Sequence, residues 1–345
     1  MAALMVVFGG CTSHSDSGAS SQTSGERVII TGAGSSFDYP FFTRAFYQYS
    51  QEHPGISVNY QSIGSGGGIQ QFSNKTVDFG ATDVPMNAKE LGQADSAAGI
   101  VQLPIALGGV AVAYNVPDAP EHLKLSGALL ASIFSGSIRD WNDPAIARLN
   151  PGGSLKSLPI VVVHRADGSG TTFIFTDYLS AVDASWKRTI GKGKSISWAA
   201  PSAVGAKGNE GVAGQIQNTP GAIGYVELSY ALQNKMSYAA IENRSHAFIL
   251  PSPRSIAAAA AAKPAVSAKD FSIVDAAGPL VYPISGYSWL LVYHSYPDSA
   301  KEAAIRNLFR WVLGAGQKLA ATVNYVPLPT SVSVRAQTAL TSSPR

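Results

Sequence analysis

Apolar residues along the chain switch repeatedly between a spacing typical of strands and a spacing typical of helices. Residues 27–31 form a short β-branched run, and the apolar positions of residues 41–49 then recur at helical spacing until His53-Pro54-Gly55 ends the helix. Later strand-like or apolar runs occupy residues 56–60, 77–81, 105–116, 159–164, 222–226 and 288–293, and helical spacing returns at 69–72, 129–141, 173–179 and 300–313. This order predicts α/β layers with largely parallel sheets.

Length and charge limit the class of protein. At about 150 residues per domain, the 345-residue chain predicts roughly two domains. The hydrophobic fraction of 46% supplies a core, and a net charge of +3 excludes a strongly basic nucleic-acid-binding protein. No run approaches the ~18 apolar residues that a membrane-spanning helix needs.

The first 26 residues are predicted to be a targeting segment rather than part of the fold. A short apolar run ends at Gly9-Gly10-Cys11, which resembles the cleavage site of a bacterial lipoprotein signal, with Cys11 as the lipidated residue. Residues 12–25 are rich in Ser, Gly and Thr, as in a flexible tether. No Lys or Arg precedes the apolar run, although a secretory signal normally carries one. The alternative is a buried free cysteine in a frayed N-terminus.

Three turns share one composition: glycines and hydroxyl residues between a strand and a helix. They are residues 32–37, 64–68 and 167–171. Glycine lets the backbone approach a ligand, and the first N–H groups of a helix lack internal partners. Such donors, together with the helix dipole, favour an oxyanion. None of the turns matches a nucleotide-binding glycine motif, so the pattern indicates a small oxyanion.

Two charged residues refine this prediction. The Arg165 guanidinium can bind two oxygens of a tetrahedral anion while Asp167 fixes its orientation; the alternative is an ordinary surface pair. Asp83 follows the third predicted strand, and an ionised carboxylate only accepts hydrogen bonds. It would therefore favour an oxyanion that still carries a proton, as hydrogen phosphate does and sulfate does not. The alternative is that Asp83 caps a helix starting near Met86.

Several segments in order are similar to the phosphate-binding protein of bacterial phosphate ABC importers. They are TGAGSSF, SIGSGGGIQQF, TVDFGATDVP, HRADGSGTTFIFTDYL, KGNEGV and PGAIGYVELSYA. The resemblance covers roughly residues 28–335. It implies a two-lobe periplasmic-binding-protein architecture with a hinge and a ligand cleft between the lobes. It assigns 27–104 plus 282–345 to lobe I and 105–281 to lobe II.

The same resemblance implies a set of phosphate-binding residues: Ser36, Phe37, Ser65, Asp83, Arg165, Asp167, Ser169, Gly170 and Thr171. Ser36 stands where the family often has Thr, and His164 stands where a second Arg is common. The implied partners are inorganic phosphate and the membrane permease subunits of an importer, with no nucleic acid. Membrane association is expected only through a lipid anchor, and the expected location is the periplasm or cell surface.

Two other function classes stay open. The chain could bind a different tetrahedral oxyanion, sulfate or molybdate, but such a fully ionised ligand would be repelled by the Asp83 carboxylate. A phosphate-ester hydrolase would need a nucleophile and a base, for which His164 and Ser169 are the available pair, since no Gly-x-Ser-x-Gly elbow is present. The six histidines show no metal-binding spacing, so neither a metal nor a cofactor is expected.

Overall fold

The computed structural model describes residues 27–94, 99–153 and 155–342. The predictions for residues 1–26, including Cys11 as the lipidated residue, lie outside these ranges. Within them, every helix is too short or too polar to cross a bilayer.

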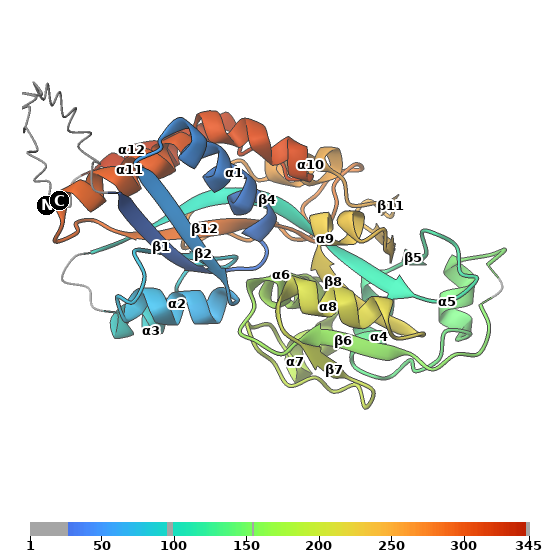
Figure 1. Cartoon of the computed structure of the whole chain (residues 1–345). Coiled ribbons are helices and arrows are strands. Elements are labelled where there is room, and N and C mark those ends of the chain that lie inside the picture. The colour runs from blue at the N-terminus through green and yellow to red at the C-terminus, as the bar shows by residue number, and fades with distance from the viewer. Residues whose placement is uncertain (1–26, 95–98, 154, 343–345) are drawn as a thin grey trace, which may run out of the picture.

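The first half of the molecule is built on three parallel strands. β1 (Val28–Gly34) lies between β2 (Ile56–Ser62) and β3 (Phe79–Thr82) and pairs in parallel with both. Helix α1 (Tyr39–Glu52) covers one face, while α2 (Ser65–Ser73) and α3 (Ala88–Gln93) lie at the other (Figure 1). The apolar stripe predicted for α1 is its buried face, and the helix ends at Glu52, directly before His53.

Two long strands join this half to the second. β4 (Ile100–Asn115) runs the length of the molecule, and β12 (Ser285–Tyr293) returns antiparallel beside it (Figure 1). β4 pairs with β12 up to Gly109 and with β8 (Ala222–Glu227) from Val110 onward. The lobe boundary expected after residue 104 therefore falls inside β4, a few residues before this change of partner.

The second half repeats the parallel arrangement with shorter strands. β6 (Val161–Arg165) pairs in parallel with β8 and with β7 (Val204–Ala206). The helices of this half are α4 (Gly127–Phe134), α5 (Pro144–Leu149), α6 (Gly170–Val182), α7 (Ala184–Thr189), α8 (Gly208–Gln217) and α9 (Leu228–Gln233). A small sheet is formed by β11 (Phe248–Ile249), β10 (Ala240–Glu242) and β5 (Lys124–Leu125), and β9 (Ser237–Tyr238) pairs with β4.

The main sheet has the order β2-β1-β3-β12-β4-β8-β6-β7, and it corrects the expectation of largely parallel sheets. β12 is antiparallel to β3 and β4, and β4 is antiparallel to β8 and β9. The reason is topological, because β4 carries the chain out of the first half and β12 brings it back. The α/β, two-lobed fold class is confirmed.

The C-terminal segment returns to the first half and packs against its strands. After α10 (Pro253–Ala262), β12 leads into α11 (Ser299–Leu313), the 3-10 helix η2 (Ala315–Val323) and α12 (Thr330–Thr341). α11 packs beside β1, and α12 packs beside β4.

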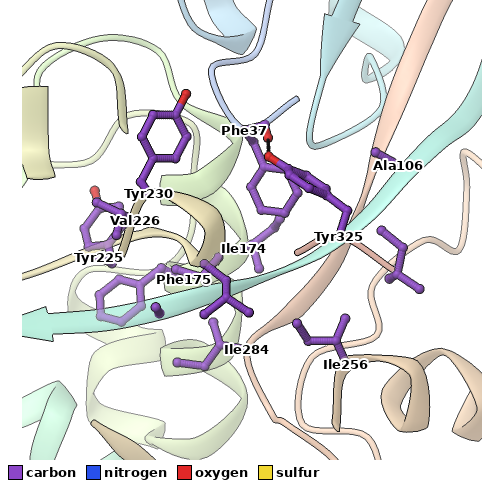
Figure 2. Close-up of a cluster of buried hydrophobic side chains, with 14 of the residues drawn as sticks. Phe37, Ala106, Ile174, Phe175, Tyr225, Val226, Tyr230, Ile256, Ile284 and Tyr325 are labelled. Atoms are coloured by element: carbon purple, nitrogen blue, oxygen red, sulfur yellow. Dashed lines mark hydrogen bonds between the residues drawn. The ribbon is translucent and has the colours of Figure 1, made fainter. Parts of the chain in front are cut away.

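One apolar core continues through both halves. Phe37 and Tyr325 from the first half lie near Ile174, Phe175 and Tyr225 from the second (Figure 2). The Tyr325 hydroxyl donates to the Phe37 carbonyl. Gly108 of β4 permits this packing, because a Cβ there would lie 2.7 Å from the Phe37 ring. The core thus fixes the turn after β1, which carries the first predicted binding loop.

Candidate functional site

The ends of β1, β3 and β6 meet where the two halves of the molecule touch. The Gly66 N–H donates to the Gly168 carbonyl at 2.7 Å, joining the second predicted loop to the third. A Cβ on Gly170 would lie 2.5 Å from the Cβ of Asp83, so only glycine allows this approach. The Gly64 N–H donates to the Gly34 carbonyl at 2.8 Å, which joins the first loop to the second, so all three glycine–hydroxyl loops line one site.

Asp83 lies in the middle of this site and is 2% exposed. The Ser35 hydroxyl donates to its Oδ1, and the Ser288 hydroxyl lies 2.9 Å from the same atom. Its Oδ2 lies 3.4 Å from the Thr171 hydroxyl of the second half. Burial raises the pKa of Asp83 to about 6, although these hydroxyls and the Arg165 charge lower it in part.

Asp83 does not cap a helix. The helix that follows is α3, which starts at Ala88 and is capped by Asn87 in a capping box with Glu90. The alternative that Asp83 is a helix cap is therefore wrong, and its carboxylate is available to the site.

Arg165 provides the positive charge of the site. Its side chain is 1% exposed, and its Nε donates to Asp167 Oδ1 at 2.7 Å while its Nη2 donates to Oδ2. This two-point contact fixes the plane of the guanidinium. Burial opposes ionisation of Asp167, but the Arg165 contact holds the pKa of its carboxyl below the usual range. The alternative of an ordinary surface pair is excluded by this burial.

Three serine hydroxyls accept hydrogen bonds from the protein, which leaves their own protons for a ligand. Ser36 Oγ accepts from the Asn209 backbone N–H at 3.1 Å and from its Nδ2 at 2.9 Å. Ser65 Oγ accepts from the N–H groups of Asp83 at 3.2 Å and Gly170 at 3.1 Å, thereby bridging both halves. Ser169 Oγ caps α6 by accepting from the Thr172 N–H at 3.0 Å.

The backbone N–H groups of two predicted binding residues, Phe37 and Gly170, already have partners within the protein. The Phe37 N–H donates to Ser35 Oγ at 2.9 Å, and the Gly170 N–H donates to Ser65 Oγ. The Thr171 hydroxyl lies 3.3 Å from Asn209 Nδ2 and 3.4 Å from Arg165 Nη1. The structure thus brings all nine predicted residues into one region, with the hydroxyls and Arg165 as its most available donors.

The proposed pairing of His164 with Ser169 is absent from the described residues. His164 stacks on Trp198, and its Nδ1 lies 2.9 Å from the Arg165 carbonyl. Ser169 Oγ accepts from the Thr172 N–H, and no hydrogen bond joins Ser169 to His164 in the described part of the chain. The described residues also hold no group of three or more His, Cys, Asp and Glu arranged for a metal.

Comparison with known proteins decides the family. A family model described as the PBP superfamily domain matches residues 17–315. A phosphate-binding protein PstS of Xylella fastidiosa is 47% identical over 88% of this chain and 82% of its own length. One from Pasteurella multocida is 43% identical over 89% of this chain and 88% of its own length. The chain belongs to the PstS family.

Solved structures agree with PstS membership at the level of the fold. A periplasmic phosphate-binding protein, PfluDING, solved with bound phosphate, aligns with a TM-score of 0.72 at 24% identity. The alignment covers 90% of this chain and 93% of that one. The phosphate-binding protein of Stenotrophomonas maltophilia aligns with a TM-score of 0.67 at 18% identity, over 90% and 93% of the two chains.

Sequence reasoning missed four buried polar residues at the site of this PstS member: Ser35, Asp38, Asn209 and Ser288. Asn209 lies in the KGNEGV motif, next to Gly208, whose φ of 71° marks a special turn. That glycine was the available signal. Ser288 gave none, because it is one polar position in an apolar strand and only the register of β12 brings it to Asp83.

Proposed function

We propose that the chain binds inorganic phosphate as hydrogen phosphate and delivers it to the permease subunits of an ABC importer, outside the cytoplasm. The observation that carries this proposal is the composition of the buried site. Several hydroxyl donors and one guanidinium surround the buried carboxylate of Asp83, which only accepts hydrogen bonds when it is ionised. Membership of the PstS family supports the same ligand and the importer partner.

The residues divide the work of binding a protonated tetrahedral dianion. Arg165, with its plane fixed by Asp167, donates to two ligand oxygens. Ser36, Ser65, Ser169 and the Thr171 N–H at the N-terminus of α6 supply further donors. The Asp83 carboxylate accepts a hydrogen bond from the protonated oxygen of the ligand. An oxyanion without a proton would place an unprotonated oxygen against this buried carboxylate, which is repulsive.

The contacts between the halves support a hinged closure around the ligand. Residues 27–104 with 282–345 would move as one lobe and 105–281 as the other, with β4 and β12 as the connections. Ser65 Oγ bonds the backbone of both lobes only when they are together. We infer that phosphate stabilises this closed arrangement. Scattering should show a smaller radius of gyration with phosphate than without it.

The proposal excludes catalysis, and a binding assay tests it. Calorimetry on the purified chain, stripped of ligand by unfolding and refolding, would compare phosphate, arsenate and sulfate. We expect tight binding of phosphate and arsenate, which both carry a proton near neutral pH, and weak binding of sulfate. Equal affinity for sulfate would reject Asp83 as the selector, and release of phosphate from an ester would reject the binding-only role.

A further inference from the structure

Asp38 is a fully buried acid in an unusual position. It is the N-cap residue of α1, yet its side chain makes no capping bond, and its exposed fraction is 0%. The carboxyl group instead turns into the protein, where Oδ2 lies 2.6 Å from the Ser288 hydroxyl. Oδ1 has no hydrogen-bond partner within the described part of the chain. An aspartate at this position normally satisfies the helix N–H groups, so its orientation needs another explanation.

The groups around Asp38 disfavour a negative charge. Asp83 after β3 and Glu227 at the end of β8 are buried acids, Tyr325 after η2 is a buried phenol, and Tyr60 of β2 is a partly buried one. Arg165 acts on Asp83 but is already bound at two points by Asp167. Burial and the neighbouring charge of Asp83 raise the pKa of Asp38 well above its usual range, although the Ser288 contact lowers it in part.

The hydrogen bonds of Ser288 show what a neutral Asp38 would do. Ser288 Oγ carries one proton and has three acceptors in reach: Asp38 Oδ2 at 2.6 Å, Asp83 Oδ1 at 2.9 Å and the Thr82 carbonyl at 3.2 Å. If Asp38 were ionised, the Ser288 hydroxyl would donate its hydrogen bond to Asp38 Oδ2, because this acceptor is the nearest. The lone pairs of Ser288 would then face Asp83.

A protonated Asp38 reverses the direction of the bonds. Its hydroxyl donates to Ser288 Oγ, and Ser288 then donates to Asp83 Oδ1. The Ser35 hydroxyl donates to the same Oδ1, so both of its acceptor positions are filled. Oδ2 of Asp83 is then the oxygen that accepts the hydrogen bond from the protonated oxygen of the ligand.

We propose that Asp38 is a neutral acid that positions Asp83 through Ser288, and thereby sets the preference of the site for a protonated oxyanion. Asp38 does not contact the ligand in this arrangement. The inference rests on the proposed function, because it explains how the phosphate-selecting carboxylate is oriented.

The protonation state of Asp38 can be measured on the unmodified chain. Carbon-13 NMR of protein labelled at the aspartate carboxyl carbon would follow each aspartate between about pH 5 and pH 8, with Asp38→Asn used only to assign its signal. We expect Asp38 to keep the chemical shift of a carboxylic acid throughout, whereas Asp167 keeps that of a carboxylate. A carboxylate shift for Asp38 at neutral pH overturns the proposal.

The pH profile of phosphate binding separates positioning from a structural role. Without the donor at residue 38, Ser288 is free to turn to Thr82, and Asp83 loses a hydrogen bond that lowers its pKa. In Asp38→Leu, the loss of phosphate affinity on acidification (the acidic limb of the binding profile) should therefore occur at higher pH. The ratio of phosphate affinity to sulfate affinity should fall about tenfold. Asp38→Asn should rescue both, because its amide N–H₂ donates to Ser288 as the neutral acid does.

The opposite sign would contradict the inference. Removal of a real negative charge beside Asp83 would lower its pKa, so both variants would move the acidic limb to lower pH. Asp177→Asn is the matched control, since Asp177 is also buried but bonds Lys192 and Ser272 away from the site. If the unmodified chain fails to bind phosphate, the proposed function fails. If it binds while Asp38 is ionised, only this inference fails.

Discussion

The two halves of the site present opposite charges, and each charge is held by its own half. In the first half, Asp83 is bonded by Ser35 and Ser288, which are neutral hydroxyls. In the second, Arg165 is bonded by Asp167, which neutralises it. The first half therefore carries an acid without a matching cation of its own, whereas the second carries a balanced ion pair.

This difference assigns separate roles to the halves. The Arg165–Asp167 pair offers donors at little electrostatic cost, so it supplies affinity for any tetrahedral oxyanion. Asp83 repels an anion unless the anion brings a proton, so it supplies selectivity. Variants on the two sides should consequently differ in kind as well as in size.

The largest loss of affinity is expected from the cationic side. Arg165→Ala removes two charge-assisted hydrogen bonds, each worth about 1.5–3 kcal/mol, and leaves Asp167 unpaired near the anion. Loss of one of these bonds should weaken phosphate binding by at least about tenfold, and loss of both by at least about a hundredfold, while sulfate weakens in parallel. Calorimetry would measure both ligands, with the exposed Arg188→Ala as control. An unchanged dissociation constant would remove Arg165 from the site.

A substitution at Asp83 should change the ratio of phosphate affinity to sulfate affinity more than the affinity for phosphate itself. Asp83→Asn keeps the size of the side chain but supplies an amide that can donate to an unprotonated oxygen. We expect the phosphate-to-sulfate ratio to narrow by about tenfold or more, mainly because sulfate is admitted. Competition titrations at fixed ionic strength would show it, beside the buried control Asp177→Asn. A variant as selective as the unmodified chain would contradict the role of Asp83.

The sequence predicts the parts of the site that are local along the chain. The turns after β1 and β6 carry glycine and hydroxyl residues directly before a helix, so their donors are visible from spacing alone. Arg165 and Asp167 are two residues apart, and their pairing follows from that proximity. The chemistry of an acid beside an anion site identifies Asp83, although the local sequence pattern fits a helix cap equally well.

The remaining parts depend on contacts that are distant in sequence. Ser288 reaches Asp83 across 205 positions, and Asn209 reaches Ser36 across 173. The antiparallel course of β4 and β12 is likewise invisible to periodicity, because a buried central strand is apolar in either direction. Asp38 gives no signal for a different reason, since an aspartate at a helix start is typical of a cap, which this residue does not form.

Glu227 is a further buried acid, and it lies in the second half without contacting the ligand in the proposed mechanism. Its Oε2 accepts from the Ser229 N–H at 2.8 Å, and burial raises the pKa of Glu227 to about 8. Between its unfolded pKa of 4.5 and this value, only the folded state holds the proton. Stability is therefore highest at the acidic end of this range and falls as pH rises, by about 1.4 kcal/mol per pH unit.

Glu227→Gln should remove this pH dependence. Urea unfolding between about pH 5 and pH 8 should show a flatter profile for the variant than for the unmodified chain, with the exposed Glu210→Gln as control. Parallel profiles for the unmodified chain and Glu227→Gln would mean that Glu227 is ionised in the fold.

The smallest effect is expected at the rim, where an ion pair joins the two halves. Lys194 Nζ bonds Glu90 Oε1 of α3, and the two side chains are 17% and 19% exposed. The Lys194 carbonyl accepts from the Ser169 N–H at 2.8 Å, and Glu90 Oε2 accepts from the Asn87 N–H at 2.9 Å. Both ends of the pair are therefore anchored, one at the binding loop and the other at a helix cap.

An anchored, half-buried pair should favour the closed arrangement without touching the ligand. Lys194→Met and Glu90→Gln each keep the anchoring contacts and remove one charge, so phosphate should dissociate about two- to tenfold faster with little change in association. Stopped-flow release would measure this, and the double variant should add little to either single one. Added salt should shrink the difference, since the pair is partly exposed to solvent. The pair Lys156–Asp118, within the second half, is the matched control, since its side chains are 76% and 70% exposed. If its disruption changes release as much as loss of the rim pair does, the rim pair does not stabilise closure.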